Sequence, residues 1–168
     1  MDKQQITEEL KNATEELLEI IESVPEESFN ASPSKNSWSP GQVVEHLIKV
    51  ETGTLRSFSG PLEQCERNSE EKVEKIQDDF LNFKTKMTAF KPIIPDEKPK
   101  DKTKALNKMQ DIRQRLVSLI DIQDLTELVA GFDHPLFGRL SKVEWIYFNI
   151  YHGKRHAHQI IQTMNQLD

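Results

Sequence analysis

The sequence predicts an all-α fold, a four-helix bundle formed by a single domain over residues 1–168. Three observations support this prediction: four segments carry apolar residues at helical spacing, no segment is a convincing strand, and two of the four segments begin with a capping-box sequence. A chain of 168 residues is long enough to bury one hydrophobic core. A bundle is the usual arrangement in which four such helices bury their apolar faces.

The first predicted helix occupies the N-terminal segment and ends before Pro25, which cannot continue it. Its apolar stripe consists of Ile6, Leu10, Ala13, Leu17, Ile20 and Ile21. Residues 25–37 are rich in Pro, Ser and Asn, and they are predicted to form a loop.

The second predicted helix begins within the sequence SWSPGQ. Ser39 is expected to be its N-cap, Pro40 its first residue, and Gln42 the side chain that completes a capping box. One face of this helix carries Val43, His46, Val50 and Gly53.

Residues 59–103 have the weakest pattern in the sequence. Val73, Ile76 and Phe80 have the spacing of a short helix within residues 69–81, and the three prolines of KPIIPDEKPKDK are typical of an extended connection. Eight lysines lie between Lys84 and Lys108. We interpret them as a solvated linker, and the alternative is a basic lid over an anionic ligand.

The third predicted helix covers about residues 103–121, and a turn follows it at HPLFGRL, because the residue before a proline is extended. The last helix opens with SKVE, a second capping box from Ser141 to Glu144. It is expected to continue to about Gln166.

The composition excludes some classes of function. The net charge of −6 argues against a nucleic-acid partner, since such proteins usually carry a basic face. No apolar run approaches the ~20 residues that span a bilayer, and the N-terminus lacks the apolar core of a signal peptide. Cys65 is the single cysteine, so no intramolecular disulfide can form. We therefore expect a cytoplasmic protein with no membrane partner.

Three of the five histidines lie in YHGKRHAHQI, residues 151–160. On a helix, His152 and His156 lie about 40° apart, one turn from each other, on the face that carries the large apolar residues. His158 falls well away from that face, on the side of Glu144 and Arg155, and is expected to face outward. His46, on the second helix, is expected to point inward like the pair.

Three inward histidines on two helices predict a metal site. A pair at i and i+4 can bind one ion from one helix, and a third imidazole from a facing helix completes the set. Three protein ligands leave positions open for water or substrate, as catalytic sites do. From the spacing alone, the alternative is that these histidines are hydrogen-bonded core residues.

Two stretches carry a resemblance to a known family: WSPGQVVEHLIKVE (Trp38 to Glu51) and HPLFGRLSKVEWIYFNIYHGKRHAHQI (His134 to Ile160). With the W-S/T-P…H-L opening and the H-x-x-R-H-x-x-Q-I ending in this order, the chain resembles the DinB-like superfamily, also called the YfiT-like metal-dependent enzymes. The resemblance covers essentially the whole chain, although residues 59–103 match loosely. It implies a four-helix bundle with a long crossover connection and a divalent metal ion held by His46, His152 and His156.

Members of this superfamily include thiol-dependent S-transferases, an isomerase with a thiol cofactor, and hydrolases. The resemblance therefore implies a metal-dependent enzyme that acts on a small electrophilic substrate, with zinc or nickel as the leading metals. The transferase, which we prefer by family analogy, would also use a low-molecular-weight thiol. Neither reaction needs a protein cysteine, so Cys65 is interpreted as incidental. A homodimer is a further expectation from similar proteins.

Other residues around the predicted site have open roles. Asn149 and Gln159, one turn to either side of the pair, are candidates for orienting an imidazole or the substrate, and ordinary polar contacts are the alternative. Trp38 and Trp145 are expected to pack in the core, with a pocket wall as the alternative. Around the helix axis, Glu45 points about 100° away from His46, which makes it a poor candidate for the general base. The base stays unassigned.

Two further functions stay open from the sequence. The first is a non-catalytic helical bundle with a structural or adventitious metal, which acts through a protein partner. The second is a plain bundle whose histidines are hydrogen-bonded without any metal.

Overall fold

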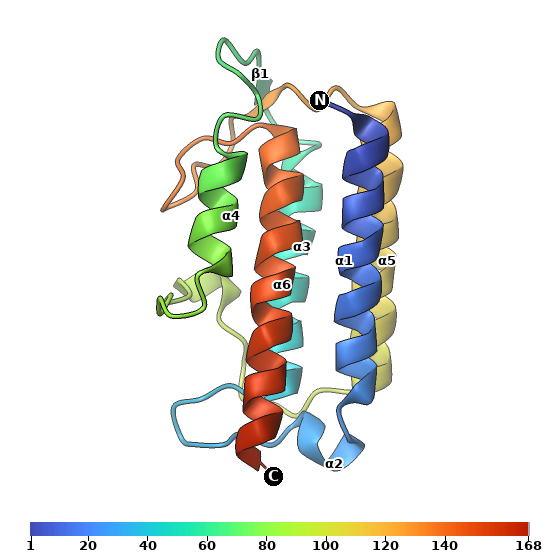
Figure 1. The fold of residues 1–168 in the computed structure, drawn as a ribbon, viewed down its shortest axis with the longest axis vertical. Coiled ribbons are helices and arrows are strands. Elements are labelled where there is room, and N and C mark those ends of the chain that lie inside the picture. The colour runs from blue at the N-terminus through green and yellow to red at the C-terminus, as the bar shows by residue number, and fades with distance from the viewer. Residues whose placement is uncertain (168) are drawn as a thin grey trace.

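The computed structural model describes residues 1–167 and confirms an all-α four-helix bundle (Figure 1). The four long helices are α1 (Lys3–Ser23), α3 (Pro40–Ser57), α5 (Lys102–Ile122) and α6 (Lys142–Leu167). The shorter elements are the helices α2 (Glu26–Phe29) and α4 (Val73–Leu81), the 3-10 turn η1 (Lys91–Ile93), and the strands β1 (Leu62–Glu63) and β2 (Leu128–Val129).

The order of the helices in space requires a long crossover. Helices α1 and α6 run in one direction and α3 and α5 in the other, and α1 and α3 each pack against both α5 and α6 (Figure 1). The helices α3 and α5 follow each other among the four long helices and lie side by side in parallel. The chain therefore has to return along the bundle between the end of α3 and the start of α5. Residues 58–101 make this return, and α4, within them, packs against the outer side of α6.

The caps predicted from the sequence form where they were expected. Ser39 accepts a hydrogen bond from the backbone N–H of Gln42, whose side chain accepts one from the N–H of Ser39. At α6 the N–H of Ser141 donates to Glu144 Oε2 over 2.9 Å, and the N–H of Glu144 donates to Ser141 Oγ over 3.2 Å. These bonds satisfy N–H groups that the first turn of a helix leaves free, and they fix where α3 and α6 begin.

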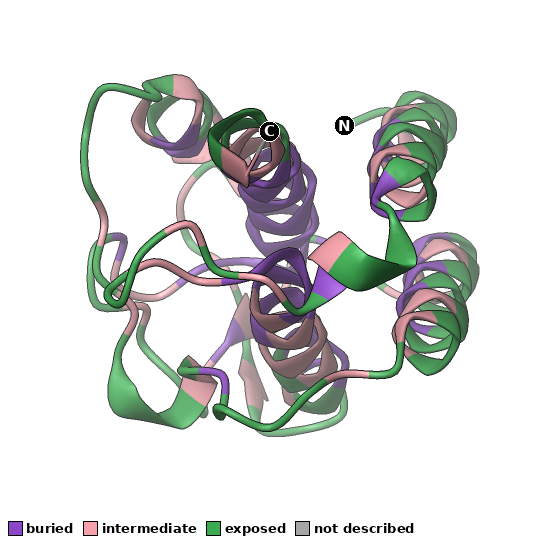
Figure 2. Cartoon of the chain, turned by 90° about the horizontal axis from the view of Figure 1, so that it is seen from below, coloured by how far each residue is buried: buried purple, intermediate pink, exposed green. Residues whose placement is uncertain are grey.

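Helix α6 is the centre of the molecule. Every residue from Lys142 to Gly153 is buried, because α1, α3 and α4 pack around this half of the helix (Figure 2). The expectation that Glu144 lies on an outward face was wrong: its side chain is 0% exposed, because residues 67–72 of the crossover cover it and pair with it. Helix phase alone does not show which segment outside the four-helix pattern covers a face.

A buried ion pair lies between α3, α5 and α6. Arg113 of α5 donates from Nε and Nη2 to the two carboxylate oxygens of Glu51 on α3, each over 2.6 Å. Burial raises the pKa of Glu51, although Arg113 opposes this. A Cβ at Gly153 would lie 2.6 Å from Arg113 Nη2, so the close approach of the guanidinium to α6 requires glycine there.

Two expectations for the connections were wrong in detail. Residues 25–37 are not entirely loop, since α2 forms one turn and buries Phe29. The expected absence of strands is also corrected, because Leu62 pairs with Val129 and Glu63 with Leu128 in a short antiparallel ladder. Two-residue strands are too short to show an alternating pattern in a sequence. Within residues 1–167, every helix is too short or too polar to span a bilayer.

Candidate metal centre

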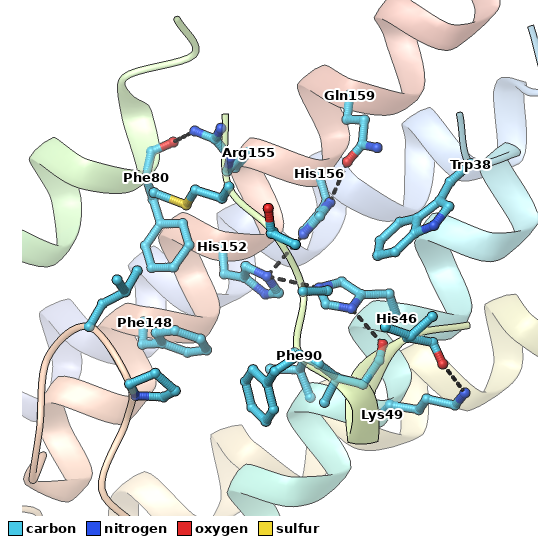
Figure 3. A pocket seen from close by; sticks show the side chains of 18 of the residues that line it. Trp38, His46, Lys49, Phe80, Phe90, Phe148, His152, Arg155, His156 and Gln159 are labelled. Carbon is cyan, nitrogen blue, oxygen red and sulfur yellow. Dashed lines mark hydrogen bonds between the residues drawn. The ribbon is translucent and has the colours of Figure 1, made fainter. Parts of the chain in front are cut away.

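Three histidines meet where α3 and α6 cross the middle of the bundle. His46 on α3 faces His152 and His156 on α6, and their Nε2 atoms point at one another (Figure 3). His152 Nε2 lies 3.2 Å from His46 Nε2 and 2.9 Å from His156 Nε2. All three side chains are buried, and together they form a group able to hold one metal ion.

The outer nitrogens of two imidazoles are anchored. His46 Nδ1 lies 2.8 Å from the backbone oxygen of Ile93, and His156 Nδ1 lies 2.7 Å from Gln159 Oε1. Both oxygens only accept hydrogen bonds, so we assign the ring proton of each histidine to Nδ1. The Nε2 atoms of His46 and His156 therefore carry lone pairs, and both lone pairs face His152.

This arrangement fits a bound cation better than a protein hydrogen-bond network. His152 Nε2 can donate at most one proton, so it cannot satisfy both lone pairs that face it. Its Nδ1 is buried and has no hydrogen-bond partner among residues 1–167, so either tautomer of His152 leaves a polar atom unsatisfied. In a tetrahedral zinc site with ligands at 2.0–2.1 Å, neighbouring nitrogens are about 3.3 Å apart, close to the spacing of these atoms.

Burial keeps the three imidazoles neutral, as metal ligation requires. The pKa of His152 is held well below 6.5, first by burial and then by the neighbouring histidines. Burial also lowers the pKa of His156 to about 3 and lowers that of His46. At neutral pH all three rings therefore offer nitrogen lone pairs rather than positive charge.

The histidines form part of the wall of a large open cleft, with a volume of about 1650 Å³. Phe148 stacks on His152 with ring centroids 5.2 Å apart, and Phe80 meets the same ring edge-on at 5.3 Å (Figure 3). On the other side, the Trp38 ring lies 5.1 Å from that of His46. An ion bound here would be held on one side by protein and be accessible to small molecules on the other.

The two candidates for orienting the ligands differ. Gln159 contacts His156 directly, as described above. Asn149 makes its contacts elsewhere: its Oδ1 accepts from Thr54 Oγ1 over 3.3 Å, and its backbone oxygen accepts from Arg113. Asn149 thus links α6 to α3 and α5, and it hydrogen-bonds none of the three imidazoles within residues 1–167.

His158 does not join the three-histidine group, in keeping with its expected helix phase, but it is not free on the surface. Its ring stacks on Phe83 with centroids 4.1 Å apart, and it borders the cleft. The segment after α4 covers this side of α6. Arg155 contributes by donating hydrogen bonds to the backbone oxygens of Phe80, Asn82 and Thr85.

Trp38 and Trp145 both line the cleft, so the expectation of core packing alone was incomplete. Trp145 is nevertheless only 5% exposed. Cys65 lies away from the cleft, where its Sγ donates to the backbone oxygen of Arg67. Glu45 pairs with Lys49 and Lys100.

The lysine-rich segment mostly behaves as a connection. Lys100 and Lys102 attach it to neighbouring elements, and Lys102 Nζ donates to the backbone oxygen of Glu22 over 2.7 Å. Lys86 borders the cleft and is exposed.

Sequence reasoning missed two contributors to this region. Ile93 anchors His46 through a backbone oxygen, and the identity of a side chain does not indicate such a contact. His134, which was assigned only to a turn, lines the cleft between Phe148 and Trp145, with centroid distances of 5.0 and 5.8 Å. No local sequence pattern predicts the contacts of His134 with Phe137 and Trp145, because they form only when the turn folds back on α6.

Comparisons with known proteins agree with the fold. A family model described as the DinB superfamily matches residues 9–160. YuaE of Bacillus subtilis (strain 168), an uncharacterized protein, is 22% identical over 149 residues, which cover 88% of this chain and 90% of YuaE.

Two solved structures share the architecture. YfiT from Bacillus subtilis, described as "a probable metal-dependent hydrolase with an unusual four-helix bundle topology", superposes with a TM-score of 0.64 at 14% identity, over 98% of this chain and 87% of YfiT. TT2238, described as a four-helix bundle protein, superposes with a TM-score of 0.59 at 17% identity, over 96% of this chain and 99% of TT2238.

Proposed function

This chain belongs to the DinB superfamily, and from that premise we propose that it is a metal-dependent enzyme that transfers a small thiol to an electrophilic substrate. The observation that carries the proposal is the group of three buried, neutral imidazoles whose lone pairs converge at the wall of an open cleft. A structural metal site is normally closed by four protein ligands, whereas three ligands beside a cleft are typical of catalytic sites.

The roles of the chain's own residues follow from their contacts. His46, His152 and His156 would hold the ion, for which zinc and nickel are our candidates, since imidazole suits both. The backbone oxygen of Ile93 and the side chain of Gln159 fix two of the rings by accepting their Nδ1 protons. When bound, such an ion supplies Lewis acidity and lowers the pKa of a ligand such as a thiol or water.

The size of the cleft favours two substrates over one. Pockets for a single small ligand usually measure about 300–1,000 Å³, and this cleft is larger, at about 1650 Å³. In the transfer, the thiolate sulfur bonds to the electrophilic carbon while the bond from that carbon to its leaving group breaks. The leaving group departs with the electron pair, and the thiol proton is released to solvent.

Hydrolysis is the second candidate, favoured by the description of YfiT as a probable metal-dependent hydrolase. In that reaction water takes the place of the thiol, and the same three histidines would hold the ion. The two reactions share the electrophile and differ in the nucleophile, so one assay can separate them.

In the assay, the protein is first loaded with zinc or nickel. It is then incubated with an electrophile, either an activated aryl halide or an activated ester, in the presence and in the absence of a small thiol. We expect thiol-dependent loss of the electrophile with formation of a thioether, and no reaction with His152→Ala. Product formation that does not depend on thiol would favour the hydrolase. Metal-loaded protein that is inert with every pair of substrates would favour the non-catalytic alternative, in which the metal is structural or adventitious and a protein partner carries the function.

A further inference from the structure

The cleft has different chemistry on the two sides of the histidines. Along α6, the residues that line it before His152 are the aromatic Trp145 and Phe148, and those that line it after His156 include Gln159, Gln162 and Gln166. With a rise of 1.5 Å per residue, each set extends about 10–15 Å from the histidines. On α6, the candidate metal centre therefore lies between an aromatic stretch, the apolar arm of the cleft, and a stretch with three glutamines, the polar arm. Trp38 and Phe83 also border the polar arm, beside His46 and His158.

Three separate segments build the apolar arm. Trp145 and Phe148 come from α6, Phe132 from the segment that leads into the turn before α6, and Phe90 from the crossover. Their rings form a continuous series, with centroids 6.3 Å apart for Phe90 and Phe132, 6.0 Å for Phe132 and Trp145, and 5.1 Å for Trp145 and Phe148. Since Phe148 stacks on His152, this aromatic wall continues directly to the metal ligands.

The apolar surface of this arm is incompletely covered by protein. Within residues 1–167, eight large hydrophobic side chains are exposed, and five of them line this cleft. Phe83 stacks on His158 on the side of the polar arm, and the other four are Phe90, Ile94, Phe132 and Leu136. Apolar side chains gathered in a concave site beside polar ligands are typical of small-molecule pockets. Gly53 of α3 opens the facing wall, because a Cβ there would meet nothing within 4 Å.

One polar group lies within the aromatic wall. The backbone N–H of Leu136 donates to His134 Nδ1 over 3.1 Å, so the ring proton of His134 is on Nε2. Burial lowers the pKa of this histidine to about 4, and it is neutral at physiological pH. It can donate one hydrogen bond to a polar substituent of a molecule held between the rings.

We infer that the apolar arm, formed by Phe90, Phe132, Trp145 and Phe148, is the subsite for an aromatic electrophile, and that the polar arm receives the more hydrophilic thiol. This inference rests on the proposed function for the roles of electrophile and thiol. The binding of an aromatic ring in the apolar arm can be measured without turnover.

The two tryptophans of the chain allow a direct binding test, because Trp38 lies beside His46, whereas Trp145 lies beside Phe148, which stacks on His152. Trp38→Phe leaves Trp145 as the sole tryptophan, in the apolar arm, and Trp145→Phe leaves Trp38, beside His46. The probe is 4-nitrobenzyl alcohol, an unreactive aromatic quencher, titrated into each variant while fluorescence is recorded. We expect saturable quenching of Trp145 and only the linear, collisional quenching of Trp38.

Further substitutions, made in the Trp38→Phe background, sharpen the test. Phe132→Ser should raise the Kd for the probe about fivefold, the size expected for one lost aromatic contact. Gly53→Leu should raise it at least as much, since a Cβ at this position meets nothing within 4 Å and the larger side chain would occupy space in the arm. Ile161→Ser is the matched control, because Ile161 is 43% exposed but does not line the cleft, and it should leave the Kd unchanged.

Linear quenching of Trp145, or a Kd that Phe132→Ser and Gly53→Leu leave unchanged, would overturn the inference. If the proposed function is wrong but the subsite is right, the probe will still bind saturably near Trp145, and no electrophile will undergo thiol transfer. Where transfer does occur, an aromatic electrophile should have a lower KM than an aliphatic one, and Phe132→Ser should reduce that preference. Transfer with equal KM values for both would contradict the subsite.

Discussion

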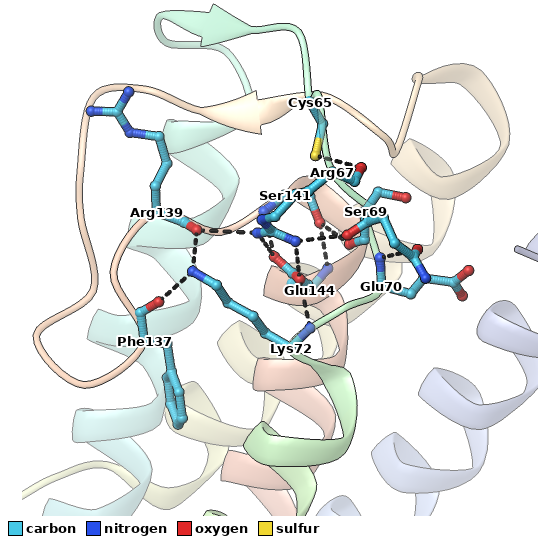
Figure 4. A network of polar contacts seen from close by, with 10 residues as sticks. Cys65, Arg67, Ser69, Glu70, Lys72, Phe137, Arg139, Ser141 and Glu144 are labelled. Carbon is cyan, nitrogen blue, oxygen red and sulfur yellow. Dashed lines mark hydrogen bonds and ion pairs between the residues drawn. The ribbon is translucent and has the colours of Figure 1, made fainter.

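Two of the buried polar clusters on helix α6, one around Glu144 at its start and one around His152 at its middle, differ in how fully their polar atoms are paired. The Glu144 carboxylate accepts two hydrogen bonds from Arg67, each over 2.7 Å, and one each from the N–H groups of Lys72 and Ser141 (Figure 4). Lys72 Nζ adds bonds to the backbone oxygens of Phe137 and Arg139. This network joins the crossover, the turn before α6 and the helix itself.

In the histidine cluster, not every buried polar atom has a hydrogen-bond partner. His152 Nδ1 has no partner among the residues described, and His152 Nε2 faces two lone pairs. Buried polar groups in folded proteins are almost always satisfied, and an unpartnered imidazole between two others at a cleft wall fits a site that a ligand completes. The comparison separates a cluster that holds the chain together from one that is able to hold an ion.

The largest expected effect concerns the paired cluster. Glu144→Gln removes the negative charge beside Arg67 and turns an amide NH₂ toward N–H donors, so the free energy of unfolding should fall by about 3 kcal/mol. Urea unfolding measures the loss, and bound zinc per folded protein should stay unchanged. The exposed ion pair between Glu63 and Arg139 provides the control, because Glu63→Gln should change stability little. A loss of zinc from folded Glu144→Gln protein would show that the two clusters are not independent.

Acid should act mainly on the histidine cluster of metal-free protein. The pKa of His156 is about 3 in the folded chain and about 6.5 when unfolded, so below pH 6.5 the unfolded chain binds more protons. Stability contributed by the neutral ring is present above pH 6.5 and is lost as pH falls toward 3. Between pH 7 and pH 5 this corresponds to a loss of about 2 kcal/mol.

Urea midpoints at the two pH values, with a chelator present, measure this acid sensitivity. His156→Gln should lose less stability than the wild type over the same range. The difference between the two proteins isolates His156 from other titrating groups, including the buried Glu51. Equal losses in both proteins would mean that the folded state does not hold His156 neutral.

Replacing His152, whose Nδ1 has no partner, should cost little stability in the absence of metal. His152→Leu removes that buried Nδ1 but also the Nε2 that lies within 3.2 Å of His46 and His156, so the two effects oppose each other and the free energy of unfolding of the metal-free variant should stay within about 1 kcal/mol of the metal-free wild type. The melting temperature of this variant should not rise when zinc is added. A destabilisation of more than about 1 kcal/mol in metal-free protein would identify His152 as a satisfied core residue, comparable to Glu144.

The smallest effect is expected at His158, which lies on the same helix but outside the three-histidine group. His158→Gln removes the ring stacked on Phe83, and it should change the free energy of unfolding by about 0.5 kcal/mol and zinc affinity not at all. Calorimetric titration with zinc measures the affinity. Zinc affinity reduced as strongly as by His156→Ala would require a different set of ligands.

The two clusters also differ in how well the sequence predicted them. The long helices and both capping boxes were predicted because apolar periodicity and Ser-x-x-Glu/Gln spacing are local properties. Helix phase likewise indicated that His46, His152 and His156 point inward and that His158 does not join them. Helix phase gave each of these residues an inward direction, and the meeting of His46 with His152, 106 positions away, depends on tertiary packing and was implied by the family resemblance.

The remaining features depend on the crossover, whose pattern is weak. Apart from Ser141, the partners of the Glu144 carboxylate come from residues 58–101, as do the ring that covers His158 and the oxygen that anchors His46. His46 is anchored by a backbone oxygen, and His158 is covered by the ring of one loop residue. No spacing rule predicts either kind of contact. A face that helix phase assigns to solvent can be covered by such a segment, as it is at Glu144.

The central claim, that His46 and the pair on α6 bind one divalent ion, is tested most directly by melting curves with and without zinc for the wild type and His46→Ala. At a free zinc concentration 100-fold above Kd, binding adds about 2.7 kcal/mol, which raises the melting temperature of a protein of this size by about 8 °C. We predict this shift for the wild type and for His158→Gln, and a much smaller one for His46→Ala in a fold that stays helical. Equal shifts in the wild type and His46→Ala would contradict the account and leave His46 as a core histidine.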